Sequence, residues 1–194
     1  AASKTQPANA IRTAAATGLK HFGENYVQEA LDKQQELSDL DLHWHFIGPI
    51  QSNKTRLIAE HFDWVHSVDR LKIAQRLNEQ RPDSLAPLNI CLQLNISQES
   101  SKSGISTAEI ASLATAIGEM KRIRIRGVMA IPKASDTTAE QREAFAAVYQ
   151  AAINLQQISE NADTVSMGMS GDMEAAIAEG ATFVRVGTDI FGPR

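Results

Sequence analysis

The sequence predicts an α/β protein whose eight parallel strands close into one (β/α)8 barrel, the TIM-barrel architecture. Short apolar runs of strand length alternate with longer amphipathic runs of helix length along almost the whole chain. Eight such units fit into 194 residues, near the lower limit for this barrel. The composition is 43% hydrophobic but only 5% aromatic, which favours an aliphatic core between helices and a sheet. A doubly wound open sheet is the second possibility.

The first half of the chain supplies four of the expected strands. Residues 1–4 have the pattern of a strand's last residues, and Pro7 and Gly18 mark the start and the stop of the first helix. The next three strands are expected at 21–24, 44–48 and 64–68, and the helices at 7–17, 26–38, 52–61 and 70–80.

The second half supplies the other four strands. They are expected at 89–96, 125–131, 164–169 and 182–186, and the helices at 107–120, 139–159 and 172–180. The run 89–96 is nearly all apolar, as expected for a strand that is buried on both faces. No linker or longer repeat interrupts the pattern, so residues 1–194 are predicted to form a single domain.

Charge and cysteine content exclude several classes of function. The net charge is −4 and the isoelectric point is about 5.7, whereas a nucleic-acid-binding surface usually needs a basic face. No apolar run reaches transmembrane length, so we expect no membrane association. The single cysteine, Cys91, lies in an apolar run and is interpreted as a small buried side chain of a protein in a reducing compartment. We therefore expect a cytoplasmic protein.

Two polar turns follow the last two expected strands. Ser170-Gly171-Asp172 comes after strand 164–169 and opens a helix, and Gly187-Thr188 comes after strand 182–186. Hydroxyl groups and free N–H groups at such turns can converge on an anion, and phosphate sites recur at this position in barrels. The pattern favours a phosphate site over two ordinary turns.

Lys4 ends the first expected strand, at the same rim of the barrel as the two turns. A lysine in a barrel mouth can form a Schiff base with a carbonyl group, although on its own a solvated surface lysine is the simpler interpretation. A ligand that carries both an aldehyde and a phosphate would use both features. Pyridoxal 5′-phosphate (PLP) is such a ligand.

Arg185 lies in the middle of the last expected strand, where an unpaired charge is costly. If it points into the barrel, it can face the pyridine nitrogen of PLP. Arginine stays protonated, so the nitrogen would stay unprotonated and the ring would be a weaker electron sink, which suits a carrier or a restrained catalyst. His43 and His45 share a strand face but lack a convincing third ligand, so we interpret them as structural and expect no metal.

Seven segments of the chain resemble the pyridoxal-phosphate homeostasis proteins, a family related to the N-terminal barrel of alanine racemase. They occur in the family's order and cover essentially the whole chain. They are SKTQP at 3–7, HFGENYVQEA at 21–30, WHFIGPIQSNK at 44–54, SKSG at 101–104, RGVMAIP at 126–132, SMGMSGDMEAAI at 166–177 and VRVGTDIFG at 184–192.

The resemblance implies a fold type III PLP barrel whose lysine carries the cofactor as an internal aldimine. It implies a protein of vitamin B6 homeostasis that holds and delivers PLP to apo-enzymes, affects amino-acid and keto-acid balance, and has no established turnover. A second lysine near the mouth, Lys102, is left without a role. The cofactor-binding positions that it implies are Lys4, Asn25, His45, Ser170, Arg185, Gly187 and Thr188.

Two enzymes on the same barrel remain as alternatives. A racemase needs an acid/base opposite the lysine, and this chain offers only Tyr26, which we expect to pack where its helix begins, and Tyr149 in mid-helix. A Schiff-base aldolase would leave Arg185 without a function. Family members usually carry a further N-terminal helix and the start of the first strand, which this sequence lacks. We expect a monomer.

Overall fold

The computed structural model describes residues 1–97, 99 and 103–193. Over these residues the sheet has seven parallel strands, and each pairs with the next one along the chain. This sequential order confirms the barrel and excludes a doubly wound sheet, in which the strand order reverses. The strands are β1 (His21–Glu24), β2 (His43–Phe46), β3 (Trp64–Val68), β4 (Leu88–Leu94), β5 (Ile123–Ala130), β6 (Thr164–Met169) and β7 (Phe183–Arg185).

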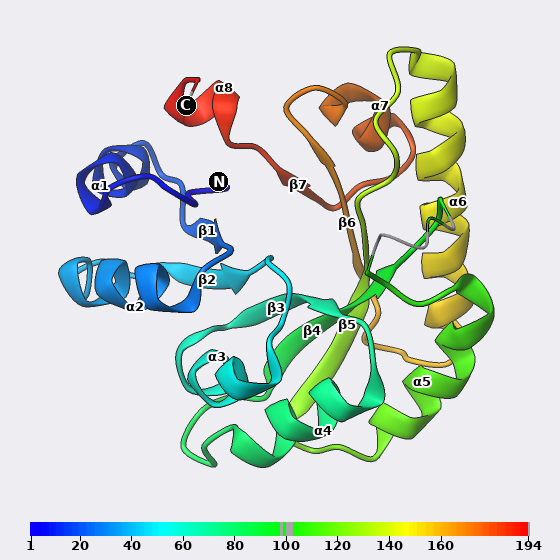
Figure 1. The fold of residues 1–194 in the computed structure, drawn as a ribbon, viewed down its shortest axis with the longest axis horizontal. Coiled ribbons are helices and arrows are strands. Elements are labelled where there is room, and N and C mark those ends of the chain that lie inside the picture. Colours follow the sequence, from blue (N-terminus) through cyan, green and yellow to red (C-terminus); the bar gives the residue numbers. More distant parts are fainter. Residues whose placement is uncertain (98, 100–102, 194) are drawn as a thin grey trace.

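The predicted first strand is reduced to one bridge that closes the ring between β7 and β1. Ala2 pairs in parallel with Gly23, and its N–H donates to the carbonyl oxygen of Val186 at 2.7 Å. The chain then turns at Thr5, whose φ of 65° ends any extended pairing. The prediction of a strand over residues 1–4 is therefore wrong in extent, although the segment does lie where the barrel closes (Figure 1).

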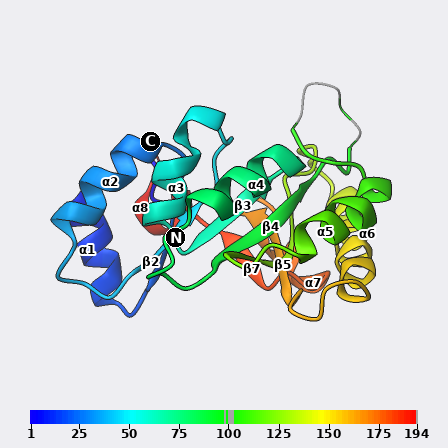
Figure 2. The same cartoon turned by 90° about the horizontal axis from the view of Figure 1, so that it is seen from below.

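Helices surround the sheet, with α1 and α2 at one side of the molecule and α5 and α6 at the other (Figures 1 and 2). The predicted helices 52–61 and 107–120 each begin with a 3-10 turn, Ser52–Lys54 and Thr107–Glu109. The helices are α1 (Ala8–Ala16), α2 (Val27–Glu36), α3 (Thr55–His61), α4 (Leu71–Gln80), α5 (Ile110–Gly118), α6 (Thr138–Gln156), α7 (Met173–Ala178) and α8 (Thr188–Phe191). The last one was not predicted, because one turn carries no periodic signal.

The apolar core lies between the sheet and the helices, with Phe22, Phe46, Phe62 and Phe145 as its largest fully buried side chains. A second, small apolar cluster of Trp64, Cys91, Met129 and the partly buried Phe183 packs separately. Its members come from β3, β4, β5 and β7, which identifies it as the filling of the barrel interior.

Cys91 is confirmed as a buried small side chain. It has no exposed surface, and burial raises the pKa of its thiol to about 12, so it stays protonated and unreactive at neutral pH. None of the described helices has the length and apolar character that crossing a membrane requires.

Candidate functional site

Most of the predicted site residues follow the carboxyl ends of neighbouring strand segments. Lys4 follows residues 1–3, the closing segment that joins the two ends of the sheet. Asn25 directly follows β1, and Ser170 directly follows β6. Gly187-Thr188 begins two residues after Arg185, the last residue of β7. Because the segments are parallel, these positions share one edge of the barrel. Gly187 also lies against the closing segment, since a Cβ atom there would be 3.2 Å from the carbonyl oxygen of Ala2.

A hollow of about 230 Å³, open to solvent, lies at this edge and is lined in part by Asn25, Asn95 and Met129. The side-chain oxygen of Asn25 is buried, and among the described residues it has no hydrogen-bond partner. Gly48 keeps the loop after β2 against this residue, because a Cβ atom would lie 2.5 Å from the Asn25 carbonyl oxygen. An unsatisfied buried acceptor beside a hollow fits a ligand that supplies the missing partner.

Residues of α2 hold the turn that carries Lys4 in place. The Thr5 N–H donates to Glu29 Oε1 at 2.7 Å, and the buried ammonium of Lys33 donates to the Ser3 carbonyl oxygen at 2.9 Å. Lys4 itself is partly buried. The left-handed backbone at Thr5 is thus held by contacts on both sides of Lys4.

Lys33 is the centre of a buried charged cluster. Its ammonium also donates to Glu24 Oε1 at 2.9 Å and to Glu29 Oε1 at 2.5 Å, while the Ser3 hydroxyl donates to Glu24 Oε1 at 2.6 Å. Burial raises the pKa of Glu24, although Ser3 and Lys33 both oppose that shift. Because an ammonium has only three N–H donors and all have acceptors, Lys33 is not available as a nucleophile.

The two predicted phosphate-binding hydroxyls are accessible at the edge. Ser170 is partly exposed and Thr188 is exposed. Over the part of the chain that the structure describes, neither hydroxyl makes a hydrogen bond, and α7 and α8 begin directly beyond these turns. The first N–H groups of a helix have no partner within it. The edge therefore offers hydroxyl and backbone donors that an anion can accept.

Arg185 hydrogen-bonds to neutral acceptors. Its NH1 group donates to Ser166 Oγ at 2.9 Å and its NH2 group to the carbonyl oxygen of Ala130 at 3.0 Å. Within the described residues it forms no ion pair, so both recorded acceptors are neutral. Burial lowers its pKa to about 10, partly offset by Asp172, and the guanidinium stays cationic at neutral pH. Three of its five N–H donors remain for a ligand.

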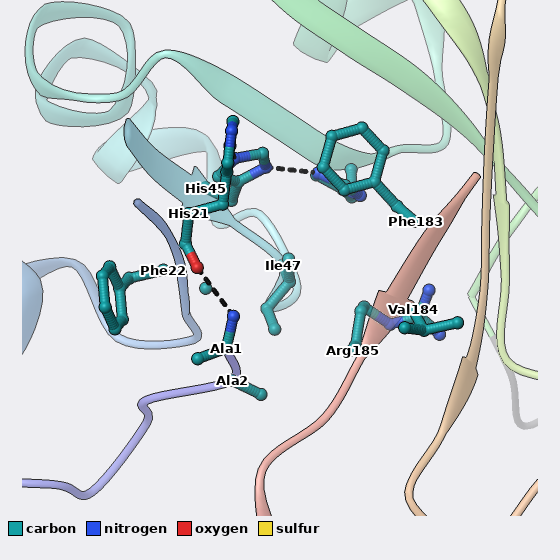
Figure 3. Close-up of a pocket in the computed structure, with 11 residues that line it drawn as sticks. Ala1, Ala2, His21, Phe22, His45, Ile47, Phe183, Val184 and Arg185 are labelled. Carbon is teal, nitrogen blue, oxygen red and sulfur yellow. Dashed lines mark hydrogen bonds between the residues drawn. The ribbon is translucent and has the colours of Figure 1, made fainter. Parts of the chain in front are cut away.

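His45 lies in the barrel interior rather than after the end of its strand. Its Nε2 atom is 2.9 Å from His21 Nδ1, its Nδ1 atom is 2.9 Å from His66 Nε2, and its ring stacks on Trp64 with centroids 5.5 Å apart. Figure 3 shows His21 and His45 facing a small cavity, with Phe183 and Arg185 on its other wall. Its predicted role near the cofactor would thus be indirect, through hydrogen bonds.

His66 and Ser166 lie next to Arg185 but were not among the predicted site residues. His66 Nδ1 lies 2.8 Å from Ser166 Oγ, which also accepts the hydrogen bond from Arg185. Burial and the charge of Arg185 lower the pKa of His66 to about 3, so it is neutral at physiological pH. The sequence feature that could have identified them is the recurrence of polar side chains at every second residue of strands that were expected to be buried.

Three other features of the sequence remain to be placed, namely Tyr26, a metal site and Lys102. Tyr26 is 60% exposed, so the expectation that it packs at the start of α2 is wrong. No group of three or more His, Cys, Asp or Glu side chains suited to a metal is found where the structure is described. Lys102 lies outside the described residues.

Comparison with known proteins identifies the family of this chain. The family model described as alanine racemase, N-terminal domain, matches residues 2–194. The pyridoxal phosphate homeostasis protein of Pseudomonas aeruginosa is 60% identical over 194 residues, which are 100% of this chain and 83% of that protein. The Escherichia coli protein of the same name is 55% identical over 197 residues, covering 100% and 84%.

Solved structures agree in fold. PipY of Synechococcus elongatus with PLP bound is 44% identical, with a TM-score of 0.90 over 99% of this chain and 91% of that one. Alanine racemase from Corynebacterium glutamicum is 16% identical, with a TM-score of 0.74 over 100% of this chain and 55% of the racemase, and shares the fold alone. The chain therefore belongs to the pyridoxal phosphate homeostasis proteins, within the alanine racemase N-terminal domain family.

Proposed function

We propose that this protein binds PLP at the carboxyl edge of its barrel and serves PLP homeostasis as a carrier. The observation that carries the proposal is the meeting, at one edge, of a lysine, two turns with accessible hydroxyls and a cationic arginine without a carboxylate partner. Relatives at 55–60% identity bear the name pyridoxal phosphate homeostasis protein, and PipY has been solved with PLP bound.

Each group has a separate task in this proposal. Lys4 supplies the amine that holds the aldehyde carbon, Ser170 and Thr188 donate to the phosphate, and Arg185 donates to the pyridine nitrogen. PLP supplies an electron-accepting ring when bound. Because Arg185 keeps its proton, it does not protonate the ring nitrogen, and the ring's electron-accepting power stays low.

The tether is tested by the colour of the protein. Purified protein given PLP is expected to gain a visible absorbance band, and borohydride reduction followed by peptide mapping should find the label on Lys4. Lys4→Ala is expected to lose the band. Lys20→Ala, which removes an exposed lysine paired with Asp41, is the matched control and should keep it. A protein that stays colourless with PLP, or label on another lysine, would overturn the assignment.

A carrier rather than a racemase is supported by the position of Tyr149. Tyr149 lies on α6 beside Gly180, which precedes β7 and so belongs to the opposite end of the barrel. Tyr26 is exposed next to Asn25 and is the one tyrosine near the site. Exchange of the α-proton of alanine in deuterated water tests the difference. Exchange at enzymic rates that Tyr26→Phe abolishes would favour the racemase.

We further propose a cytoplasmic monomer whose recipients are PLP-dependent apo-enzymes. Light scattering after size-exclusion chromatography tests the oligomeric state. Transfer is tested by mixing the loaded protein with an apo-enzyme and following the recovery of that enzyme's activity against free PLP at the same concentration. Recovery that is no faster than with free PLP would contradict a role in delivery.

A further inference from the structure

An unbroken line of hydrogen bonds runs from Arg185 across the barrel interior. Arg185 contacts Ser166 at 2.9 Å, Ser166 contacts His66 at 2.8 Å, His66 contacts His45 at 2.9 Å, and His45 contacts His21 at 2.9 Å. The line passes from β7 through β6, β3 and β2 to β1. It therefore joins five of the seven described strands and ends at His21, which is exposed.

The chemistry of the first member gives the line a direction. A guanidinium only donates, so Ser166 Oγ is an acceptor toward Arg185. The serine hydroxyl then has one hydrogen to give, and the recorded neighbour that can accept it is His66 Nδ1. If His66 donated to Ser166 instead, the serine oxygen would accept hydrogen bonds from both neighbours. The serine hydrogen would then have no acceptor among the described residues, although Ser166 has no exposed surface.

The direction set at Ser166 fixes the proton positions on the imidazoles. A neutral imidazole has one donor and one acceptor nitrogen. With Nδ1 of His66 accepting, its Nε2–H donates to Nδ1 of His45, and the Nε2–H of His45 donates to Nδ1 of His21. His45 and His66 are 4% and 1% exposed, and burial lowers the pKa of both well below the usual value, so both stay neutral.

We propose that Ser166, His66 and His45 are positioning residues for Arg185. They hold one side of the guanidinium with neutral acceptors in a fixed direction and leave its other N–H groups for a ligand. A carboxylate in the place of Ser166 would also hold the guanidinium, but its negative charge would neutralise the positive charge of Arg185. The link from this line to PLP rests on the proposed function, whereas the proton positions do not.

The proton positions are tested without the cofactor. In protein labelled with ¹⁵N-histidine, two-bond ¹⁵N–¹H correlations distinguish the two neutral tautomers. The proposal expects the Nε2–H form for His45 and His66. Ser166→Ala is expected to change the tautomer populations of His66, because Nδ1 loses its donor. Cys91→Ala, a buried interior substitution outside the line, should leave them unchanged. A wild-type His66 that carries its proton on Nδ1 would overturn the proposal.

The effect on Arg185 is tested with PLP. Ser166→Ala is expected to bind PLP about 10-fold more weakly and to shift the visible absorbance maximum and its dependence on pH. Ser166→Thr, which restores the hydroxyl, should recover both, and Cys91→Ala should match the wild type. If Ser166→Ala binds with unchanged affinity and spectrum, the positioning role is wrong. If the wild type itself binds no PLP while the tautomers are as expected, the proposed function fails and the hydrogen-bond line stands.

Discussion

The proposed contact with the phosphate depends on the hydroxyl groups of Ser170 and Thr188. Both are accessible and make no hydrogen bond within the described residues, so their removal changes the free protein little. Hydrogen bonds to a charged group contribute about 1.5–3 kcal/mol each. The double variant Ser170→Ala/Thr188→Ala is expected to bind PLP roughly 100-fold more weakly, with attachment to Lys4 still detectable at high PLP concentration.

Equilibrium titration of the visible absorbance checks this prediction. Thr13→Ala removes an exposed hydroxyl on α1 that bonds only to the Asn9 carbonyl oxygen of its own helix, and it is the matched control. Unchanged affinity in the double variant would mean that the phosphate binds elsewhere.

Loss of Lys33 would leave a buried carboxyl group without its cation. In Lys33→Met, Glu24 keeps a fully buried carboxyl group without its cation. Breaking a buried pair in this way costs about 3–5 kcal/mol of the free energy of unfolding. Urea denaturation at pH 7 measures the loss, and Lys33→Met/Glu24→Leu should recover part of it. Lys20→Met, which breaks the exposed Lys20–Asp41 pair, should cost less than about 1 kcal/mol.

His66 makes the stability of the protein depend on pH. Its folded-state pKa of about 3 lies below the ordinary value of 6.5, so the unfolded chain binds the proton first. The contribution of a neutral His66 is fully present above pH 6.5 and is lost as the pH falls toward 3. Between pH 7.5 and 5.0 this amounts to about 2 kcal/mol.

His66→Gln removes this titration and keeps a donor and an acceptor. Urea denaturation gives the free energies of unfolding of the wild type and of His66→Gln at pH 7.5 and pH 5.0. The difference between the two proteins is expected to be about 2 kcal/mol smaller at pH 5.0 than at pH 7.5. A difference that is independent of pH would show that His66 titrates normally.

At the scale of elements, the contact between β6 and α7 depends on Gly168. Its φ is 90°, and a Cβ atom there would lie 2.5 Å from the Cβ atom of Ala176. Gly168→Ala is expected to destabilise the protein by about 1–3 kcal/mol and to weaken PLP binding, because Ser170 lies between the two elements. Gly118→Ala is the matched control. It ends α5 with open space around it, so it should be neutral or stabilising by up to about 1 kcal/mol. Thermal unfolding and PLP titration measure both.

The elements themselves were largely predictable from periodicity. Gly18 and Gly180 adopt positive φ beyond α1 and α7, which is typical of a glycine that ends a helix. The misses have physical reasons. The closing segment pairs through Ala2, and this pairing depends on strands far along the chain. The one-turn α8 has too few residues for a pattern.

For the whole molecule, one apolar cluster connects the helices from α1 to α7 with the sheet. Unfolding is therefore expected to be a single transition, seen at the same urea concentration by far-UV circular dichroism and by the fluorescence of Trp44 and Trp64. PLP should shift this transition upward with its concentration, because the complete proposed site forms only in the folded barrel. Two separate transitions, or a midpoint that PLP does not move, would contradict this expectation.

The placement of the candidate site residues was predictable where they lie near strand ends, and not where it depends on strand register. Lys4, Ser170 and Thr188 stand beside turns that any barrel brings to one rim. The line behind Arg185 needs His66 and Ser166, 100 residues apart, at hydrogen-bond distance. That meeting depends on strand stagger and tilt around the closed ring, which a single sequence does not contain.

Thr5 connects the fold to the behaviour of the proposed tether. It is the one non-glycine residue with positive φ in the described chain, and Glu29 and the Ser3–Lys33 contact hold the turn on both sides. The backbone around Lys4 thus loses its conformational freedom when the protein folds, before any ligand arrives. A ligand that attaches to Lys4 then meets a preorganised backbone, so its capture and release require little ordering or disordering of the main chain.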